Sequence, residues 1–498
     1  MIVNVIDLLP DISERLDHII HSLPALAPEL VLIATFVASI LSGLFADRLW
    51  WHGTFAVTVI GILLSAVCSS FQVGNPDADG VLFGMVSTDA FGQYMRILVA
   101  VVCLLFALFV HASPDFRAHR KKTADLYTIL LAVHIGLNLM ALATNWLMTF
   151  IAIEMVSLGS YLMVGYLAAA PRQTEAAMKY VLFGAVCSAV MLYGMSLLYG
   201  FTGTLDYTSP QHIQGLNGTP SALVTLALLF VFTGIGFKLT FVPFHFWTPD
   251  VYQGAPTPVT AFLSTAPKIA GIALLANILY AWPADSFAYQ NLQLMLAGAA
   301  IVTMLWGNLA ALRQTDVKRM MAYSSIGHTG FLMMAVLAYS SQDYTALLYY
   351  LAVYSLMNMG VFMLTGYIES RTGAVDLARY DGLGKIMPLA LVCFTLIMIS
   401  LTGIPPTSGF VAKLLVFTAV FHSWQATGDI SMVLLLIVGA LTTVISLFYY
   451  FKIPLHAFLK TADSQPEMKP MRYSILWLAV VLTVAVWVLG VFPDWLVG

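Results

Sequence analysis

The chain has 498 residues, of which 60% are hydrophobic and only 9% charged, with a mean hydropathy of +0.87. Soluble proteins carry about 25% charged residues, so this composition excludes a soluble globular domain and predicts an all-α polytopic membrane protein. The net charge of −3, without a basic stripe, argues against a nucleic-acid partner. No dinucleotide fingerprint or Walker loop occurs, and four isolated cysteines inside apolar runs offer no zinc or iron–sulfur pattern: Cys68, Cys103, Cys187 and Cys393.

Fourteen apolar runs are long enough to cross a bilayer, which takes about 20 helical residues each. The run at 386–422 is too long for one straight helix and has glycines and prolines between 403 and 409, which predicts two half-helices joined by unwound backbone. The runs are 28–46, 51–71, 90–111, 124–143, 145–168, 176–200, 221–246, 258–281, 290–311, 319–339, 343–368, 386–422, 429–452 and 472–493.

The distribution of basic residues predicts the orientation of these spans. With the N-terminus outside, 17 of the 22 lysines and arginines fall on the cytoplasmic side, one (Arg15) falls outside, and four lie within spans. This is a strong positive-inside signal, and it predicts that both termini are periplasmic. The seventeen are Arg48, Arg117, Arg120, Lys121, Lys122, Arg172, Lys179, Arg313, Lys318, Arg319, Arg371, Arg379, Lys385, Lys452, Lys460, Lys469 and Arg472.

Two blocks of five spans have the same layout, each with a lysine beside a glycine or proline break in its fourth span. Because five is odd, the second block must be inverted relative to the first, and inverted repeats with broken helices are typical of proteins that move ions. Residues 1–27 either form an interfacial helix or are a polar extension. The expected units are this extension (1–27), three helices (28–123), the repeats (124–281 and 290–452) and a loop with the last helix (453–498).

Lys238 lies at mid-depth of a predicted span, where a lysine costs roughly 2.5–3.5 kcal/mol on insertion scales. Pro243, five residues later, predicts a kink or break close to the lysine. Glu154, two spans earlier at similar depth, is its predicted partner. Such a pair stays charged while joined, whereas separation favours the neutral form of each group, so protons are released and taken up. The alternative is a static ion pair that holds two helices together.

Lys268 and Lys413 also lie within spans and have no carboxylate nearby in the sequence. Lys413 follows the break at Gly409, where the positive end of the helix dipole is expected to favour loss of its proton. Lys179 opens its span and is either part of a proton path or an interfacial anchor. Arg96, close to a span end, is expected to snorkel to the surface.

Three histidines within the apolar runs, His134, His245 and His328, either carry protons between lysines or are hydrogen-bonded core residues. His245 would share the face of Lys238 if that helix continued through Pro243. The predicted path is a buried row that crosses both repeats and moves protons laterally: Glu154, Lys179, Lys238, Lys268, His328 and Lys413.

The segment G-F-K-L-T-F-V-P-F-H-F-W-T-P-D-V-Y-Q-G-A-P at 236–256 resembles the antiporter-like membrane subunits of respiratory complex I, the proton-translocating NADH–quinone oxidoreductase. The resemblance is strongest to the bacterial N-type subunit and covers nearly the whole chain. Further matching segments are Asn145-Trp146 leading to Glu154 and Ser157, and the stretches 176–180, 317–328 and 403–413.

The resemblance implies that this chain couples quinone reduction elsewhere in the complex to proton pumping. Glu154 and Lys238 match the family's glutamate–lysine pair, Lys179 and Lys268 match its connecting lysines, and Lys413 matches its terminal lysine. M-type subunits carry a glutamate at that last position, so Lys413 favours the N type.

The resemblance also implies that NADH, FMN, iron–sulfur clusters and quinone belong to partner subunits, with no cofactor in this chain. The implied partners are M- and L-type antiporter-like subunits and small membrane subunits, in the lipid bilayer of a bacterial inner membrane. Two other functions stay open: a subunit of a multisubunit cation/proton antiporter, and a structural scaffold.

Overall fold

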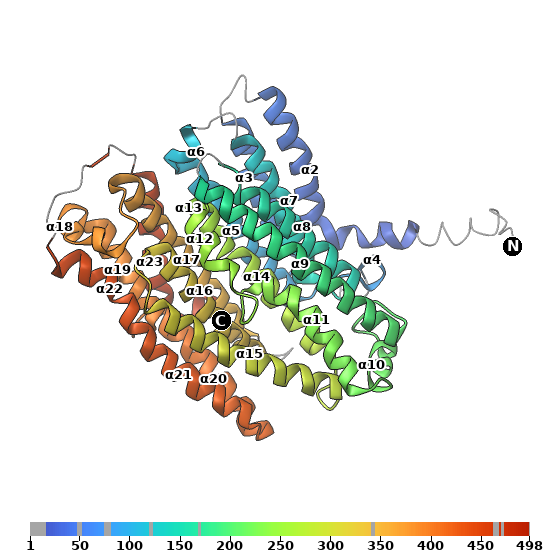
Figure 1. Cartoon of the computed structure of the whole chain (residues 1–498). Coiled ribbons are helices and arrows are strands. Elements are labelled where there is room, and N and C mark those ends of the chain that lie inside the picture. Colours follow the sequence, from blue (N-terminus) through green and yellow to red (C-terminus); the bar gives the residue numbers. More distant parts are fainter. Residues whose placement is uncertain are drawn as a thin grey trace.

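The computed structural model describes residues 16–46, 52–73, 81–118, 123–167, 171–339, 344–461, 468–469 and 473–497. Across these ranges the chain forms helices joined by turns, and β-structure is limited to isolated bridges (Figure 1). Thirteen helices of this described part are long and apolar enough to cross a membrane. The predicted all-α membrane class is therefore confirmed, while the count of fourteen spans and the inverted repeats remain predictions.

The long helices occur at the positions of the predicted spans. They are α2 (Ala27–Leu41), α3 (Gly53–Gln72), α5 (Ala90–Ala112), α7 (Thr123–Leu142), α8 (Trp146–Val164), α9 (Pro171–Thr202), α11 (Ser221–Leu239), α14 (Ala266–Tyr280), α15 (Phe287–Ala311), α16 (Val317–Leu337), α17 (Thr345–Thr372), α19 (Pro388–Thr402), α20 (Ser408–Thr427), α21 (Ile430–Tyr450) and α23 (Ser474–Val491). The short helices are α4 (Val81–Gly84), α6 (Pro114–Ala118), α10 (Pro210–Asn217), α12 (Trp247–Gly254), α13 (Thr257–Leu263), α18 (Leu383–Ile386), α22 (Lys452–Pro454) and α24 (Asp494–Val497).

Local sequence signals explain where several of these helices begin and end. Side chains of the residues before α5, α8, α15, α16 and α21 accept a hydrogen bond from a backbone N–H of the first turn, as N-caps do. The helix ends at Gly403 and Gly428 adopt the left-handed conformation that glycine favours (φ of 87° and 67°). Glycine at 403 thus ends α19 and separates it from α20, as predicted for the long run.

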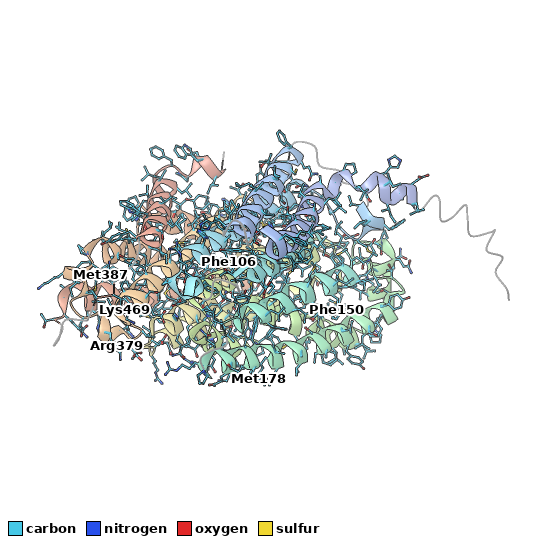
Figure 2. The ribbon with its side chains drawn as sticks, turned by 90° about the horizontal axis from the view of Figure 1, so that it is seen from above. Phe106, Phe150, Met178, Arg379, Met387 and Lys469 are labelled. Carbon is cyan, nitrogen blue, oxygen red and sulfur yellow. The ribbon has the colours of Figure 1, made fainter. Side chains whose placement is uncertain are left out.

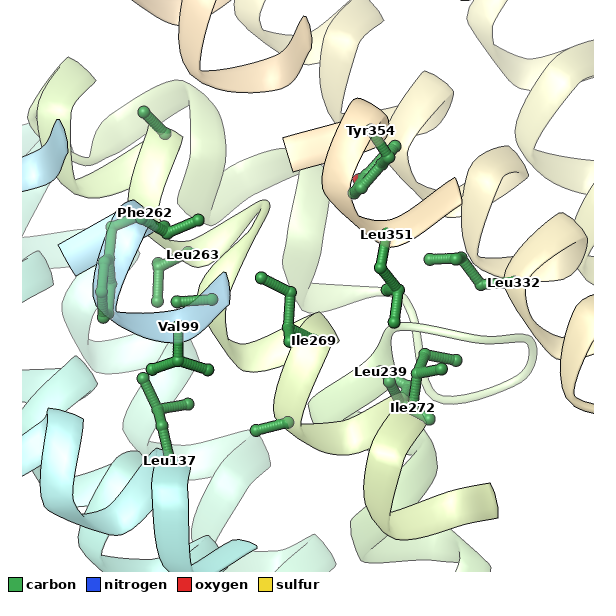
Figure 3. Packing of buried hydrophobic residues seen from close by; sticks show 14 of the residues in the cluster. Val99, Leu137, Leu239, Phe262, Leu263, Ile269, Ile272, Leu332, Leu351 and Tyr354 are labelled. Carbon is green, nitrogen blue, oxygen red and sulfur yellow. The ribbon is translucent and has the colours of Figure 1, made fainter. Parts of the chain in front are cut away.

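The helices pack into one bundle in which the N-terminal half (blue to green) lies beside the C-terminal half (yellow to red) (Figure 1). Viewed from above, Met178 lies at the edge, where its side chain is 60% exposed, whereas Phe106 is fully buried (Figure 2). Helix α14 lies at the centre, and its residues Ile269 and Ile272 point into the apolar core (Figure 3). Burial on all sides explains why this span is hydrophobic around its whole circumference.

Arg96 is fully buried, so the expectation that it snorkels is wrong. Its Nη2 forms an ion pair of 2.7 Å with Glu29 of α2, whose side chain is only 4% exposed. Gln72 and Gln93 accept further hydrogen bonds from Arg96, at 3.1 and 3.0 Å, and Asn138 of α7 donates to Glu29 at 3.0 Å. This polar cluster ties α2, α3, α5 and α7 together.

Some sequence-based predictions concern residues outside the described ranges. Among the basic residues counted for orientation these are Arg15, Arg48, Arg120, Lys121, Lys122 and Arg472. Within the N-terminal extension, residues 16–22 are helical, and Leu16 and Ile20 are exposed. The choice between an interfacial helix and a polar extension therefore stays a prediction.

Candidate functional site

Lys238 lies in the last turn of α11, directly before the helix breaks. The helix ends at Leu239, and Thr240 then adopts a left-handed conformation (φ of 65°), which is uncommon for a residue with a side chain. The chain continues without regular helix to Trp247, where α12 begins. The break predicted from Pro243 is thus observed, four residues before the proline itself.

Other parts of the bundle satisfy the backbone groups that this break exposes. Trp247 Nε1 donates to the carbonyl of Phe237 at 3.1 Å, and the Thr329 hydroxyl of α16 donates to the carbonyl of Leu239 at 3.0 Å. The N–H of Val242 donates to Thr303 Oγ1 of α15 at 3.0 Å. Because unpaired backbone groups are costly at membrane depth, these contacts are what allow a permanent break beside the lysine.

Lys238 has no direct carboxylate partner among the described residues, which corrects the expected Glu154–Lys238 ion pair. Its side chain is buried (2% exposed), and Nζ donates to Ser157 Oγ at 3.2 Å. Glu154 lies one turn earlier on α8 and accepts a hydrogen bond from the Ser188 hydroxyl of α9. Although Glu154 is not in contact with Lys238, its negative charge acts on the lysine. The Ser157 hydroxyl therefore lies on the same face of α8 as the Glu154 carboxylate and contacts Lys238.

His245 is not on the face of Lys238, because α11 has ended before this residue. The histidine is buried in the turn that follows, where its ring lies beside Phe246 and meets the edge of Trp306 at 5.8 Å between centroids. The helical spacing used to place it next to Lys238 applied only to an unbroken helix. His134 lies on α7, where its side chain is fully buried in the core.

Lys268 lies beside a helix break that the sequence analysis did not predict. The span 257–280 is divided into α13 and α14 at Ser264 and Thr265, and Lys268 is in the first turn of α14. Pro267, near the start of α14, is the sequence signal that could have revealed this break. Tyr354 OH of α17 donates to the carbonyl of Ser264, at the break, at 3.0 Å.

The ammonium group of Lys268 is fully buried among neutral oxygens. It donates to the carbonyl of Ser325 at 2.7 Å and to Thr329 Oγ1 at 2.6 Å, both on α16. Because Thr329 also bonds the carbonyl of Leu239, one hydroxyl connects Lys268 to the residue next to Lys238. Thr329 of α16 therefore links the Lys268 ammonium to the backbone beside Lys238.

Lys413 spans the break between α19 and α20. The side chain is 6% exposed, and Nζ donates to the carbonyl of Thr402, in the last turn of α19, at 2.9 Å. Lys413 lies in the second turn of α20, near its positive end as predicted, but its ammonium group points back to the negative end of the α19 dipole. A carbonyl at a helix C-terminus stabilises a cation, so this contact opposes the expected effect of the α20 dipole.

His328 lies on α16, where the charges of both Lys268 and Lys413 act on it. Its Nδ1 is 2.8 Å from the hydroxyl of Tyr350, and its Nε2 is 3.0 Å from the hydroxyl of Tyr450. A neutral imidazole has one donor and one acceptor nitrogen, and a hydroxyl can match either. Both ring nitrogens therefore have a hydrogen-bond partner in either tautomer. A group that gains and loses a proton needs such partners.

Lys179 is separate from the buried lysines. Its side chain is 39% exposed, and it forms ion pairs of 2.7 Å with Glu175 and with Asp250 of α12. Asp250 also pairs with Arg319 of α16, at 2.5 Å. These groups border a cavity of about 200 Å³ lined by Arg172, Glu175, Ala176, Lys179, Asp250, Gln253 and Gly254.

The charges of this exposed cluster determine the state of Asp250. Partial burial alone would raise the pKa of its carboxyl, but hydrogen bonds from Lys179 and Arg319 outweigh that effect and hold the pKa below its ordinary value of 3.8. Asp250 is therefore ionised at neutral pH and bridges α9 to α16. The sequence analysis did not single out this aspartate, although it lies in the T-P-D-V-Y-Q segment.

The buried site consists of three lysines at three helix breaks, each bonded to neutral oxygens. Lys238, Lys268 and Lys413 take part in no ion pair within the described part of the chain, where no group of His, Cys, Asp or Glu side chains is placed to hold a metal ion either. A buried ammonium without a carboxylate is the kind of group that loses its proton readily. The arrangement suits reversible proton binding rather than metal or redox chemistry built from these side chains.

Comparison with known proteins identifies the family of this chain. Residues 143–446 match the family described as NADH:quinone oxidoreductase/Mrp antiporter, TM. The chain is 37% identical over 466 residues to NADH-quinone oxidoreductase subunit N 2 of Chloroherpeton thalassium, covering 92% of this chain and 89% of that protein. It is 38% identical over 427 residues to NADH-quinone oxidoreductase subunit N of Chlorobium chlorochromatii, covering 84% and 82%.

Two solved structures extend the comparison to the whole fold. A chain of respiratory complex I from Thermus thermophilus superposes with a TM-score of 0.76 at 30% identity, over 94% of this chain and 97% of that one. A chain of the Mrp complex from Dietzia superposes with a TM-score of 0.78 over 95% and 96%, but at 21% identity it shows the fold alone. The chain thus belongs to the family of membrane subunits shared by NADH:quinone oxidoreductases and Mrp antiporters.

Proposed function

We propose that this chain is the N-type membrane subunit of a proton-translocating NADH–quinone oxidoreductase, a translocase to which it contributes no redox centre of its own. Its role is to move protons through the buried lysine row while electrons pass from NADH to quinone in partner subunits. The identities of 37% and 38% to subunits of that name support the assignment. The observation that carries the mechanism is that each of three buried lysines lies at a helix break and donates hydrogen bonds to neutral oxygens, without an ion pair among the described residues.

The proposed path begins with Glu154 and Lys238 and runs laterally to Lys413. When Lys238 is charged, Ser157 and the nearby Glu154 carboxylate stabilise it. When its proton is passed on, the hydroxyl of Thr329 leads toward Lys268, which lies in direct contact with it. His328 then lies between Lys268 and Lys413, within the electrostatic influence of both. Ordered water completes the transfers between groups that are not in contact.

Lys179 and His245 have secondary roles in this proposal. Lys179, Glu175 and Asp250 border the cavity of about 200 Å³ at one end of the first repeat, where protons can approach from solvent. His245 lies within the backbone turn after Lys238 and can adjust the turn when the lysine changes charge. The positive-inside pattern puts the Lys179 end on the cytoplasmic side and both termini on the periplasmic side of a bacterial inner membrane.

The partners proposed for this chain are M- and L-type subunits and small membrane subunits of the same complex, within the lipid bilayer. NADH, FMN, iron–sulfur clusters and quinone are assigned to other subunits. A chain of a membrane-bound sulfane sulfur reductase also superposes, with a TM-score of 0.78 at 25% identity. The fold therefore serves several membrane complexes, and the N-type assignment rests on the identity to N-type relatives.

The test is NADH-driven proton pumping in membrane vesicles that carry the complex with Lys238→Met. Removing a positioned proton carrier typically costs about 100-fold or more, so we expect pumping and coupled NADH oxidation to fall severely while the complex assembles normally. Lys385→Met is the matched control, since this lysine is exposed and far along the chain from the buried row. Unchanged pumping in Lys238→Met would support the scaffold function instead.

The same vesicles separate this function from cation/proton antiport. We expect pumping to persist without sodium, because the described residues of the site include no cluster of carboxylates of the kind that holds a hard cation. A strict sodium requirement, with NADH oxidation unaffected by loss of Lys238, would favour an antiporter subunit.

A further inference from the structure

A chain of polar side chains leaves the lysine row at His328 and leads toward one end of the bundle. The hydroxyl of Tyr450, in the last turn of α21, contacts His328 Nε2 at 3.0 Å. The Ser324 hydroxyl of α16 bonds the same tyrosine hydroxyl. All three side chains are buried. A pair of hydroxyls within hydrogen-bond distance of a titratable imidazole has the connectivity of a proton wire.

Further polar side chains lie near the ends of α15 and α21. The ring of Tyr449 lies 4.3 Å from that of Tyr450. The Tyr449 hydroxyl donates to Asn308 Oδ1 of α15 at 3.0 Å. Asn308 lies one turn before the end of α15, where the carbonyl of Leu312 accepts a hydrogen bond from Lys452 at 2.5 Å. Lys452 is partly exposed and marks the surface.

The polar chain leads from His328 toward one end of the bundle. Ser324, at the second turn of α16, and Tyr450, at the end of α21, both lie toward the end where Lys318 and Lys452 are found. The positive-inside pattern makes this end cytoplasmic. The lysine row and the polar chain therefore share His328.

We propose that Ser324 and Tyr450 form a proton-uptake branch that supplies His328 from the end of the bundle marked by Lys452. Tyr449 and Asn308 position the tyrosine hydroxyls at its outer part. This inference rests on the proposed function, because the branch has a use only if His328 passes protons to the lysine row. It gives the second repeat its own supply, separate from the cavity at Lys179.

The proton balance of one transfer is simple. The Tyr450 O–H bond breaks as its proton moves to His328 Nε2, while the Tyr450 oxygen takes a proton from the Ser324 hydroxyl. Ser324 is restored by a proton from a hydronium ion of the solvent, which leaves a neutral water molecule at the outer end. Both hydroxyl residues end neutral, and His328 carries the added positive charge until a lysine accepts it. The hydroxyls then rotate back to their starting orientation.

The test is Tyr450→Phe in the assembled complex, measured as NADH-driven pumping in vesicles in H₂O and in D₂O. We expect pumping to fall about 10-fold, less than the ~100-fold typical of a removed acid or base, since water can partly replace the hydroxyl. The solvent isotope effect should rise, because proton uptake becomes limiting. Ser324→Ala is expected to give the same two changes.

The matched control is Tyr349→Phe, which removes a hydroxyl that donates to the carbonyl of Leu489 at 2.8 Å instead of to His328. Normal pumping in Tyr450→Phe, or an equal loss without an isotope effect in Tyr349→Phe and Tyr450→Phe, would overturn the branch. If Lys238→Met abolishes pumping while Tyr450→Phe does not, only the branch fails. If Lys238→Met itself pumps normally, the proposed function fails as well.

Discussion

Two buried polar regions of this molecule stabilise charged side chains inside the apolar bundle in opposite ways. Around Arg96, the guanidinium meets the Glu29 carboxylate at 2.7 Å, and three amide side chains complete the hydrogen bonds. Around Lys238, Lys268 and Lys413, each ammonium donates to hydroxyl or carbonyl oxygens and has no carboxylate in contact among the described residues. Arginine in a carboxylate pair keeps its charge permanently, whereas a lysine among neutral oxygens can lose its proton.

This difference distinguishes the structural role of the Arg96–Glu29 pair from the proposed transport role of the three lysines. The ion pair between Arg96 and Glu29 is a fixed tie between helices. A lysine without a carboxylate in contact can change its protonation without leaving a buried carboxylate unpaired. Four substitutions test this distinction.

The largest effect is expected from Arg96→Leu. Removing one partner leaves the Glu29 carboxylate buried without compensation, which typically costs about 3–5 kcal/mol. The amount of assembled complex in the membrane and its thermal unfolding temperature should both fall sharply. The double variant Glu29→Leu/Arg96→Leu should recover much of the loss, and an equally severe defect there would show that the pair is more than a structural tie.

Lys413→Met is expected to have the reverse profile. Assembly should stay near normal, because methionine fills a similar volume and leaves only the Thr402 carbonyl without its partner. Pumping should fall by about 100-fold, the usual consequence of losing a positioned proton carrier. Pumping per assembled complex is the measurement, and a loss of assembly that matches the loss of pumping would place Lys413 with Arg96 as a structural charge.

Ser157→Ala is expected to have a smaller effect on pumping. It removes the hydroxyl that bonds Lys238 and so leaves the ammonium without its one direct partner in the described structure. A buried group left unsatisfied costs about 1–3 kcal/mol, which should slow pumping roughly 10-fold. Ser160→Ala, on the same helix, removes only a bond to its own backbone at Val156 and serves as control. Equal rates in the two variants would contradict a role for Ser157.

The smallest effect is expected from Asp250→Asn in the exposed cluster. Ion pairs of this exposure contribute about 0.2–1 kcal/mol, so thermal stability should change little, and less still at high salt. The pKa of Asp250 is held below 3.8, so its stabilisation is complete above that value and is lost as pH falls through the lower folded pKa. Stability and pumping should therefore show no Asp250-dependent change around neutral pH. A clear difference there between the variant and the unmodified complex would show that Asp250 carries protons.

Much of the fold follows from patterns that one sequence displays. The spans, the basic residues at their ends and the break at 403–409 follow from hydropathy, charge and glycine or proline content, because the bilayer imposes these requirements on each segment separately. The break at Ser264 and Thr265 was missed, since Pro267 is also compatible with an unbroken helix that begins there. Arg96 was misjudged because its partner, Glu29, is distant in the chain.

For the site, the sequence alone determined that Lys238, Lys268 and Lys413 are buried cations, since each interrupts an apolar run. Tertiary structure alone decided what surrounds them: Ser157 rather than Glu154 against Lys238, Thr329 shared between the α11 break and Lys268, and the α19 carbonyl end facing Lys413. The physical reason is that burial is a property of a segment, whereas a hydrogen-bond partner depends on which helices meet and at what depth. The protonation chemistry of each lysine is therefore set by residues on other helices.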